Sequence, residues 1–97
     1  MSNGAGQLQT GNLYGTVTDS EGEALPGVTL TLSGVEHPRI QISNAEGQFR
    51  FMGLEPGTYK LTAELDGFNT VEHPDIKISA GHDTTIKIEM TLANVEE

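Results

Sequence analysis

Three carboxylates alternate around a glycine in one short turn of the chain. Asp19, Glu21 and Glu23 surround Gly22, and carboxylate oxygens gathered in a loop are the ligands that Ca²⁺ prefers. The run lacks the dense Asp and Asn pattern of dedicated calcium loops, and acidic turns are usually solvated without binding a metal. We therefore treat Asp19, Glu21 and Glu23 as a weak calcium candidate, and we predict no other metal site and no cofactor.

Two of the three histidines lie in matching Glu-His-Pro sequences. His37 and His73 would form a transition-metal pair if their loops met in the fold. The sequence leaves open whether the loops meet, and exposed loop histidines are common. A zinc peptidase site needs a His and a Glu at close spacing together with a distant His. None of His37, His73 and His82 is followed by a Glu three residues later, so the histidines do not indicate a peptidase.

Covalent catalysis has no better support in the sequence. The chain has no cysteine, so no thiolate can attack a substrate, and no Ser or Thr lies in a nucleophile-elbow sequence. The hydroxyl residues instead occupy outward positions of predicted strands, where they are favoured. Because neither a nucleophile nor an acid–base pair is recognisable, we predict that the chain is not an enzyme.

Aromatic residues bear on a possible sugar site, because β-sandwiches bind carbohydrate on exposed aromatic platforms. Among the two Tyr and three Phe of the chain, only Tyr14 falls on a position that can face outward. Carbohydrate binding through Tyr14 is therefore an alternative function, as is calcium binding at the acidic turn. The remaining four rings fall on positions predicted for the core, and they are Phe49, Phe51, Tyr59 and Phe68.

The charge of the chain restricts its partners. The formal net charge is −9 with only five Lys and Arg residues, whereas phosphate backbones and anionic lipid surfaces require clustered basic residues. No apolar run approaches the ~20 residues of a membrane span, and Met1–Gln9 has neither the charged start nor the apolar middle of a signal peptide. We predict no nucleic-acid partner and no direct membrane insertion, and we expect the chain to be an excised piece of an exported protein.

Strands with one apolar face account for most of the chain. Its 97 residues suffice for one core, and twelve glycines fall between the apolar segments, as in an all-β chain with tight turns. The short third segment is expected at a sheet edge, and Pro74 in the sixth predicts an edge or a bulge. Seven such segments without helical periodicity predict a single antiparallel seven-stranded β-sandwich. They are Leu13–Asp19, Val28–Ser33, Ile40–Ile42, Gln48–Phe51, Gly57–Leu65, Asn69–Ser79 and Asp83–Leu92.

The stretch Asn44–Leu65 is predicted to form the middle of the core as a β-meander. Its first strand, Gln48–Phe51, alternates polar and apolar residues. Pro56 and Gly57 have the residue types of a type II turn, in which the glycine takes a positive φ. Outside this stretch, Gly15 lies inside a predicted strand, which indicates that another backbone or a ring packs closely against it.

The order of turn glycines and core rings along the chain is more specific than the strand pattern. The successive landmarks are Gly15-Thr16-Val17-Thr18-Asp19, Leu25-Pro26-Gly27-Val28, Asn44-Ala45-Glu46-Gly47-Gln48-Phe49, Gly53-Leu54-Glu55-Pro56-Gly57-Thr58-Tyr59 and Asp66-Gly67-Phe68. In this order they resemble the carboxypeptidase regulatory-like domain. The resemblance covers roughly Gly11 to Leu92 and implies a transthyretin-like, or prealbumin-like, Greek-key sandwich.

The resemblance also implies a function. Such domains are accessory modules in metallocarboxypeptidases and at the N-terminus of TonB-dependent outer-membrane receptors. We expect a non-catalytic interdomain spacer or protein-interaction domain of an exported or cell-surface bacterial protein. Its partners would be neighbouring domains of the same polypeptide or another protein, in a periplasmic, outer-membrane-associated or extracellular location.

Three regions are expected along the chain. Residues 1–10 are polar and glycine-rich and are predicted to be a disordered tail. Residues 11–92 form the sandwich, and residues 93–97 form an acidic tail or linker. The sequence Leu92–Glu97 resembles the link that leads toward the plug in TonB-dependent receptors.

Overall fold

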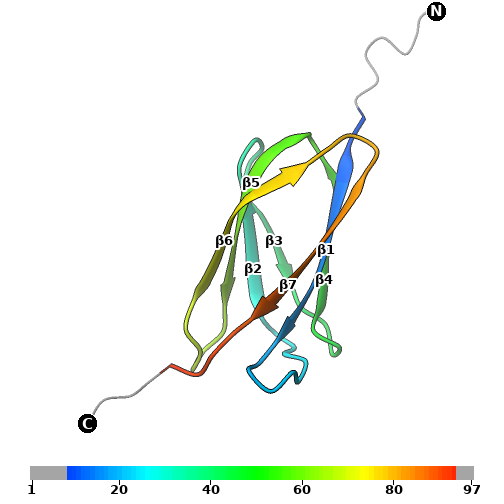
Figure 1. The fold of residues 1–97 in the computed structure, drawn as a ribbon. Helices are drawn as coiled ribbons and strands as arrows, with labels where there is room; N and C mark the ends of the chain where they lie inside the picture. Colours follow the sequence, from blue (N-terminus) through cyan, green and yellow to red (C-terminus); the bar gives the residue numbers. More distant parts are fainter. Residues whose placement is uncertain (1–8, 94–97) are drawn as a thin grey trace, which may run out of the picture.

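Seven strands form two sheets that pack face to face (Figure 1). The computed structural model describes residues 9–93, and this part of the chain contains no helix. One sheet has the strand order β4-β1-β7 and the other has the order β3-β2-β5-β6. The predicted β-sandwich is therefore confirmed. The strands are β1 (Gly11–Thr18), β2 (Thr29–Ser33), β3 (Arg39–Ile42), β4 (Gln48–Leu54), β5 (Gly57–Glu64), β6 (Val71–Ile78) and β7 (Asp83–Glu89).

The core lies between the sheets. It is built from inward-facing residues, which alternate along each strand with outward-facing ones. Along β1 the burial alternates residue by residue, with Leu13 and Val17 fully buried, because successive side chains of a strand point to opposite faces. The rings of Phe49 and Phe51 meet edge to face with centroids 6.1 Å apart. Phe68 packs against the core from its margin. Three of the four rings predicted for the core, including Tyr59, are therefore buried, and Phe68 is half-buried at its margin.

The predicted meander is wrong. The strands β4 and β5 belong to different sheets, so Glu55 and Pro56 carry the chain across the sandwich without forming a hairpin. Gly57 has a φ of +154°, which is positive but far from the roughly +80° of a type II turn. A period-2 pattern identifies which face of a strand is buried, but it does not indicate to which sheet the strand belongs.

The first and last strands are parallel neighbours. They pair in unbroken register from Asn12 opposite Asp83 to Thr18 opposite Glu89, the one departure from the antiparallel pairing expected. Because β1 and β7 run in the same direction, the chain enters at one end of the sandwich and leaves at the other (Figure 1).

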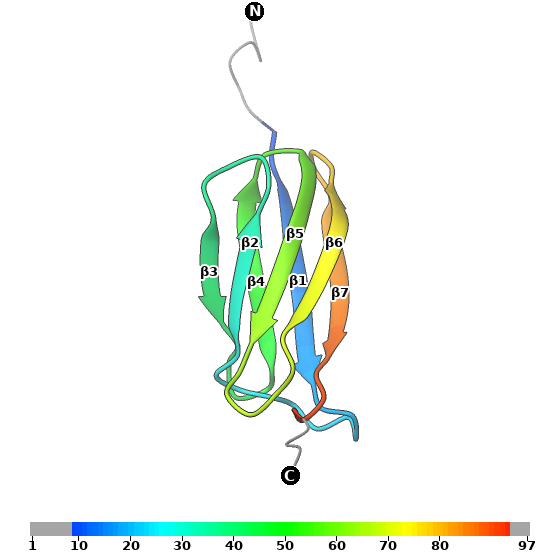
Figure 2. The same ribbon diagram turned by 90° about the vertical axis from the view of Figure 1, so that its left-hand side faces the viewer.

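Both edges of the four-stranded sheet are the predicted ones. Figure 2 shows this sheet in front, with β3 at its left edge and β6 at its right. Pro74 lies in β6, where the register shifts between Tyr59 and Leu61 of β5. Asp75 beside it has a φ of +61°, so the proline occupies both an edge and a bulge, as its missing amide requires.

Gly15 is approached by a ring, as predicted. A Cβ added at Gly15 would lie 2.2 Å from Cζ of Phe49, its register partner on β4. The outer parts of two predicted regions, residues 1–8 of the tail and residues 94–97 of the acidic end, lie outside the described residues.

Candidate functional site

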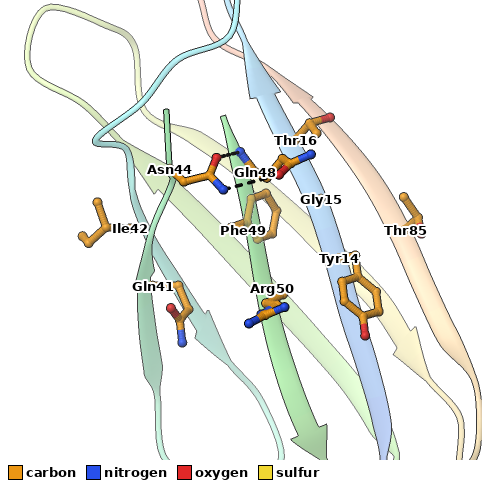
Figure 3. A pocket seen from close by; sticks show the side chains of 10 residues that line it. All are labelled: Tyr14, Gly15, Thr16, Gln41, Ile42, Asn44, Gln48, Phe49, Arg50 and Thr85. Carbon is orange, nitrogen blue, oxygen red and sulfur yellow. Dashed lines mark hydrogen bonds between the residues drawn. The ribbon is translucent and has the colours of Figure 1, made fainter. Parts of the chain in front are cut away.

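A shallow hollow of about 530 Å³ lies on the outside of the three-stranded sheet and reaches around β4 to β3 (Figure 3). Tyr14 of β1 lies at one side of it. In the sheet register Tyr14 is opposite Arg50 of β4 and Thr85 of β7. These three side chains face outward because their neighbours along each strand fill the core.

The upper rim of the hollow is fixed by the turn before β4. Oδ1 of Asn44 accepts the amides of Glu46 at 3.0 Å and Gln48 at 2.8 Å. Nδ2 of Asn44 donates to Oε1 of Gln48 at 3.3 Å (Figure 3). These bonds form an Asx-type turn, and they hold two amide side chains at the opening of the hollow.

The lining offers hydrogen bonds and one positive charge. Its side chains supply amides, hydroxyls, the phenol of Tyr14 and the guanidinium of Arg50, and they include no carboxylate. The Tyr14 hydroxyl donates to Sδ of Met52 at 3.6 Å, which orients the ring along the sheet. The hollow can therefore bind a polar or anionic group, but its lining has no acid–base pair for proton transfer. The lining residues are Tyr14, Gly15, Thr16, Gln41, Ile42, Asn44, Gln48, Phe49, Arg50 and Thr85.

A second polar cluster holds together the end of the sandwich where the chain enters. Glu36, in the loop between β2 and β3, accepts the Glu55 amide at 2.7 Å through its carboxylate. Nη1 of Arg39 lies 3.4 Å from the same carboxylate. This amide hydrogen bond, with support from Arg39, holds the pKa of Glu36 below its ordinary value.

Tyr59 completes this cluster from the core side. Its hydroxyl donates to the carbonyl of Glu55 at 2.7 Å and lies 3.4 Å from Oε2 of Glu36. Burial, together with the nearby charge of Glu36, raises the pKa of Tyr59 to about 12. The cluster ties the β2–β3 loop to the crossing between β4 and β5, which gives it a structural role.

The three calcium candidates lie in the loop between β1 and β2. Oδ1 of Asp19 accepts the amides of Glu21 at 2.8 Å and Glu23 at 2.9 Å, so this carboxylate already shapes its own turn. The side chains of Glu21 and Glu23 are exposed. Within residues 9–93, no three His, Asp or Glu side chains gather as a possible metal site. Calcium at this turn stays a prediction.

The two matching histidines are separated by the strand order. His37 lies in the loop between β2 and β3, whereas His73 is on β6 opposite Leu61. Because β5 lies between β2 and β6, the structure does not bring these residues together as a pair. His73 points toward the interior, where its Nδ1 is buried without a hydrogen-bond partner among the described residues.

Sequence reasoning missed the role of Ser43 and the exposure of β3. Ser43 is buried and bridges two loops, because its hydroxyl donates to the Leu25 carbonyl at 2.7 Å and accepts the Val28 amide at 2.9 Å. Ile40 and Ile42 face solvent. Their alternation with Arg39 and Gln41 signalled a strand, but no local signal distinguishes an outward apolar face from an inward one.

The sequence comparison agrees with the fold. The family model of the carboxypeptidase regulatory-like domain matches residues 12–91. The chain belongs to this family. No curated protein sequence matches the chain at a significant level. No apolar helix of membrane-spanning length occurs in the described part of this carboxypeptidase regulatory-like domain.

Solved structures of low sequence identity share the fold of this carboxypeptidase regulatory-like domain. The Bacillus anthracis TIE protein has a TM-score of 0.73 and 14% identity, covering 87% of this chain and 17% of that one. A putative carbohydrate binding protein from Bacteroides uniformis has a TM-score of 0.68 and 16% identity, covering 82% and 40%. GBS52, the minor pilin of Streptococcus agalactiae, has a TM-score of 0.68 and 18% identity, covering 93% and 48%. The chain thus spans less than half the length of each of these proteins.

Proposed function

We propose that the chain is a non-catalytic accessory module that spaces or recruits other domains of an exported or cell-surface bacterial protein. The observation that carries this proposal is the parallel pairing of β1 with β7, which separates entry and exit by the length of the sandwich. The eight residues of β1 span about 26 Å at the usual rise of a strand. A module with this geometry extends a polypeptide along one axis.

The larger context of the module is part of the same proposal. Residues 11–92 would be the folded unit, with residues 1–10 and 93–97 as flanking tail and linker. Membership of the family and the fold shared with a minor pilin support a periplasmic, outer-membrane-associated or extracellular location. The Leu92–Glu97 sequence supports a position before the plug of a TonB-dependent receptor.

Replacement of the module in the full-length protein tests this function. In one variant residues 11–92 are deleted, and in another they are exchanged for an unrelated β-sandwich of equal length with its ends at opposite poles. We expect deletion to impair the assembly or activity of the full-length protein. Retained function after exchange identifies a spacer, and lost function after exchange identifies an interaction domain. Unchanged function after deletion would contradict both.

Carbohydrate binding is the second candidate, favoured by the hollow at Tyr14. A half-buried ring among amide and hydroxyl side chains is the chemistry with which proteins bind sugars. Titration with a panel of neutral and acidic oligosaccharides is expected to shift amide resonances around Tyr14, with loss of the shifts in Tyr14→Ala. Calcium at Asp19, Glu21 and Glu23 is a further alternative, and an absence of heat in calorimetry at millimolar calcium would remove it.

A further inference from the structure

One side of the sandwich carries most of the exposed large apolar side chains of the described residues. Among the described residues, five large apolar side chains are exposed, and four of them lie on β3, on β4 or in the loop before β3. Here this region is called the β3–β4 side. The four are Val35 (49% exposed), Ile40 (60%), Ile42 (55%) and Met52 (47%).

The two strands of the β3–β4 side lack acidic residues, as β1 and β2 also do, but they alone carry arginine. The chain carries a net charge of −9, but neither β3 nor β4 contains an Asp or Glu, and both arginines of the chain, Arg39 and Arg50, are on these strands. Arg39 is engaged with Glu36 and with the Met52 carbonyl. Arg50 is exposed, and no ion pair of Arg50 occurs within residues 9–93.

The backbone of β3 has one free side. The amide of Ser43 donates to the carbonyl of Val28, the residue just before β2, and residues of an antiparallel ladder alternate between facing the partner and facing away from it. Gln41 therefore faces β2, while the N–H and C=O groups of Ile40 and Ile42 point to the open edge. These groups are available to pair with another strand.

The two edge strands of this sheet, β3 and β6, differ in the residues that block pairing with another strand. Proteins usually block exposed edges with proline, lysine or a bulge, and β6 has Pro74, Lys77 and the bulge at Asp75. β3 is short and begins with Arg39, but its four residues include no proline, lysine or bulge. The edge at β3 is thus accessible while the opposite edge is protected.

We infer that β3 is a docking edge for an extended segment of a partner protein that alternates apolar and acidic residues. Added beside β3, the apolar residues of that segment would pack against Ile40 and Ile42 on the outer face. Its carboxylates would point to the opposite face, toward Gln41 and the exposed Arg50, which line the same hollow.

A second copy of this chain fits the edge poorly. Each copy brings its own net charge of −9 to such a dimer, so two copies repel one another. A short acidic segment carries only a few negative charges, and they would lie near the exposed Arg50. This inference rests on the proposed interaction role and specifies where the partner binds. The module exchange described above tests the interaction role without any peptide, so the docking edge and the interaction role can fail separately.

The probe is a capped seven-residue peptide that alternates valine and glutamate, compared with one that alternates valine and lysine. We expect the glutamate peptide, titrated to millimolar concentration into the ¹⁵N-labelled domain, to shift the amides of Ile40 and Ile42. The lysine peptide is expected to leave them unchanged. No shift with the glutamate peptide, or shifts centred on β6 or β7, would overturn the inference.

Matched variants separate charge from backbone pairing. Arg50→Glu should weaken binding of the glutamate peptide roughly two- to five-fold, as expected for one exposed ion pair, whereas Lys87→Glu on β7 makes the same charge change and should leave binding intact. Ile40→Pro removes an outward amide without touching the ladder to β2 and should abolish binding. Equal effects of Arg50→Glu and Lys87→Glu would overturn the inference. So would sedimentation showing a dimer of this chain that Ile40→Pro dissociates.

Discussion

Glu36 and Tyr59 show how single residues stabilise one end of the sandwich. Neither belongs to a reactive site: the Glu36 carboxylate receives a backbone amide and the Tyr59 hydroxyl donates to a backbone carbonyl of the same residue, Glu55. The hydrogen bond from the Glu55 amide lowers the pKa of Glu36, and burial together with the charge of Glu36 raises the pKa of Tyr59. The pH dependence of stability therefore reports on the cluster.

Acid should remove the contribution of Glu36. Since its pKa is lower in the folded state than its ordinary value of 4.5, its stabilisation is present above that pH and is lost as the pH falls through the folded value. We expect Glu36→Gln to melt at a lower temperature than the wild type at pH 7, with a smaller difference at pH 3. Glu46→Gln, an exposed carboxylate in another loop, is the control. A difference that does not change with pH would contradict the assignment.

Alkali should act on Tyr59. Its pKa rises from 10.0 to about 12 in the fold, so its stabilisation is complete below pH 10 and is lost as the pH rises toward 12. We expect Tyr59→Phe to cost about 1 kcal/mol at pH 7 through the lost hydrogen bond and to weaken the alkaline destabilisation. Melting curves between pH 7 and 11.5 measure both, with Tyr14→Phe as the matched control. Equal pH profiles of Tyr59→Phe and wild type would exclude this role.

Gly15 provides a prediction about packing. Its missing side chain leaves room for the Phe49 ring, and a methyl group there would lie 2.2 Å from the ring atom Cζ. We expect Gly15→Ala to destabilise the domain by about 1–3 kcal/mol through overpacking. Phe49→Leu in the same chain should recover part of that loss, a coupling that urea denaturation of both single variants and the double variant measures. Strictly additive effects would show that the two residues do not compete for space.

At the scale of elements, the short strand β3 depends on Ser43, which follows it. The hydroxyl of this buried residue satisfies the Val28 amide and the Leu25 carbonyl, and it thereby joins β3 to the loop before β2. We expect Ser43→Ala to cost about 1–3 kcal/mol because two buried backbone groups lose their partner. Ser33→Ala, on the half-buried end of β2, is the control. Comparable free energies of unfolding for the two variants would contradict the assignment.

Alternation in the sequence predicted the strands and their buried faces well. Val28, Leu30 and Leu32, for example, were expected inward and are fully buried or nearly so. The partners of each strand were not predictable in the same way. The Pro56-Gly57 pair suits a hairpin as well as a crossing between sheets, and the parallel pairing of β1 with β7 joins residues about 70 positions apart, beyond any local pattern.

The candidate sites were predicted less completely than the fold. Tyr14 was correctly expected on an outward position, but its neighbours in the hollow come from β3, β4 and β7 and depend on the register. The apolar side chains of β3 were not expected at the surface, because Ile40 and Ile42 have the same spacing as core residues. Only the register of β3 with β2, which places Ile40 and Ile42 beside the outward Thr31 and Thr29, shows that these isoleucines remain uncovered.

At the scale of the whole molecule, the parallel direction of β1 and β7 determines how the domain responds to tension. The chain enters and leaves at opposite ends, and its two terminal strands lie side by side over seven register pairs. Tension applied through the flanking segments would pull β1 and β7 in opposite directions along their common axis. The ladder bonds between them would then share the load and would have to break nearly together.

Mechanical resistance is therefore a consequence of this topology. In optical tweezers, we expect the domain to unfold at a clearly higher force when it is pulled from Gln9 and Ala93 than when it is pulled from Gln9 and His82→Cys. The second geometry pulls on the adjacent starts of β1 and β7 and therefore breaks the hydrogen bonds between them one by one. Similar forces in the two geometries would contradict this expectation. A domain joined to its neighbours in this way would transmit a pull from one of them to the other while its own strands stay in place.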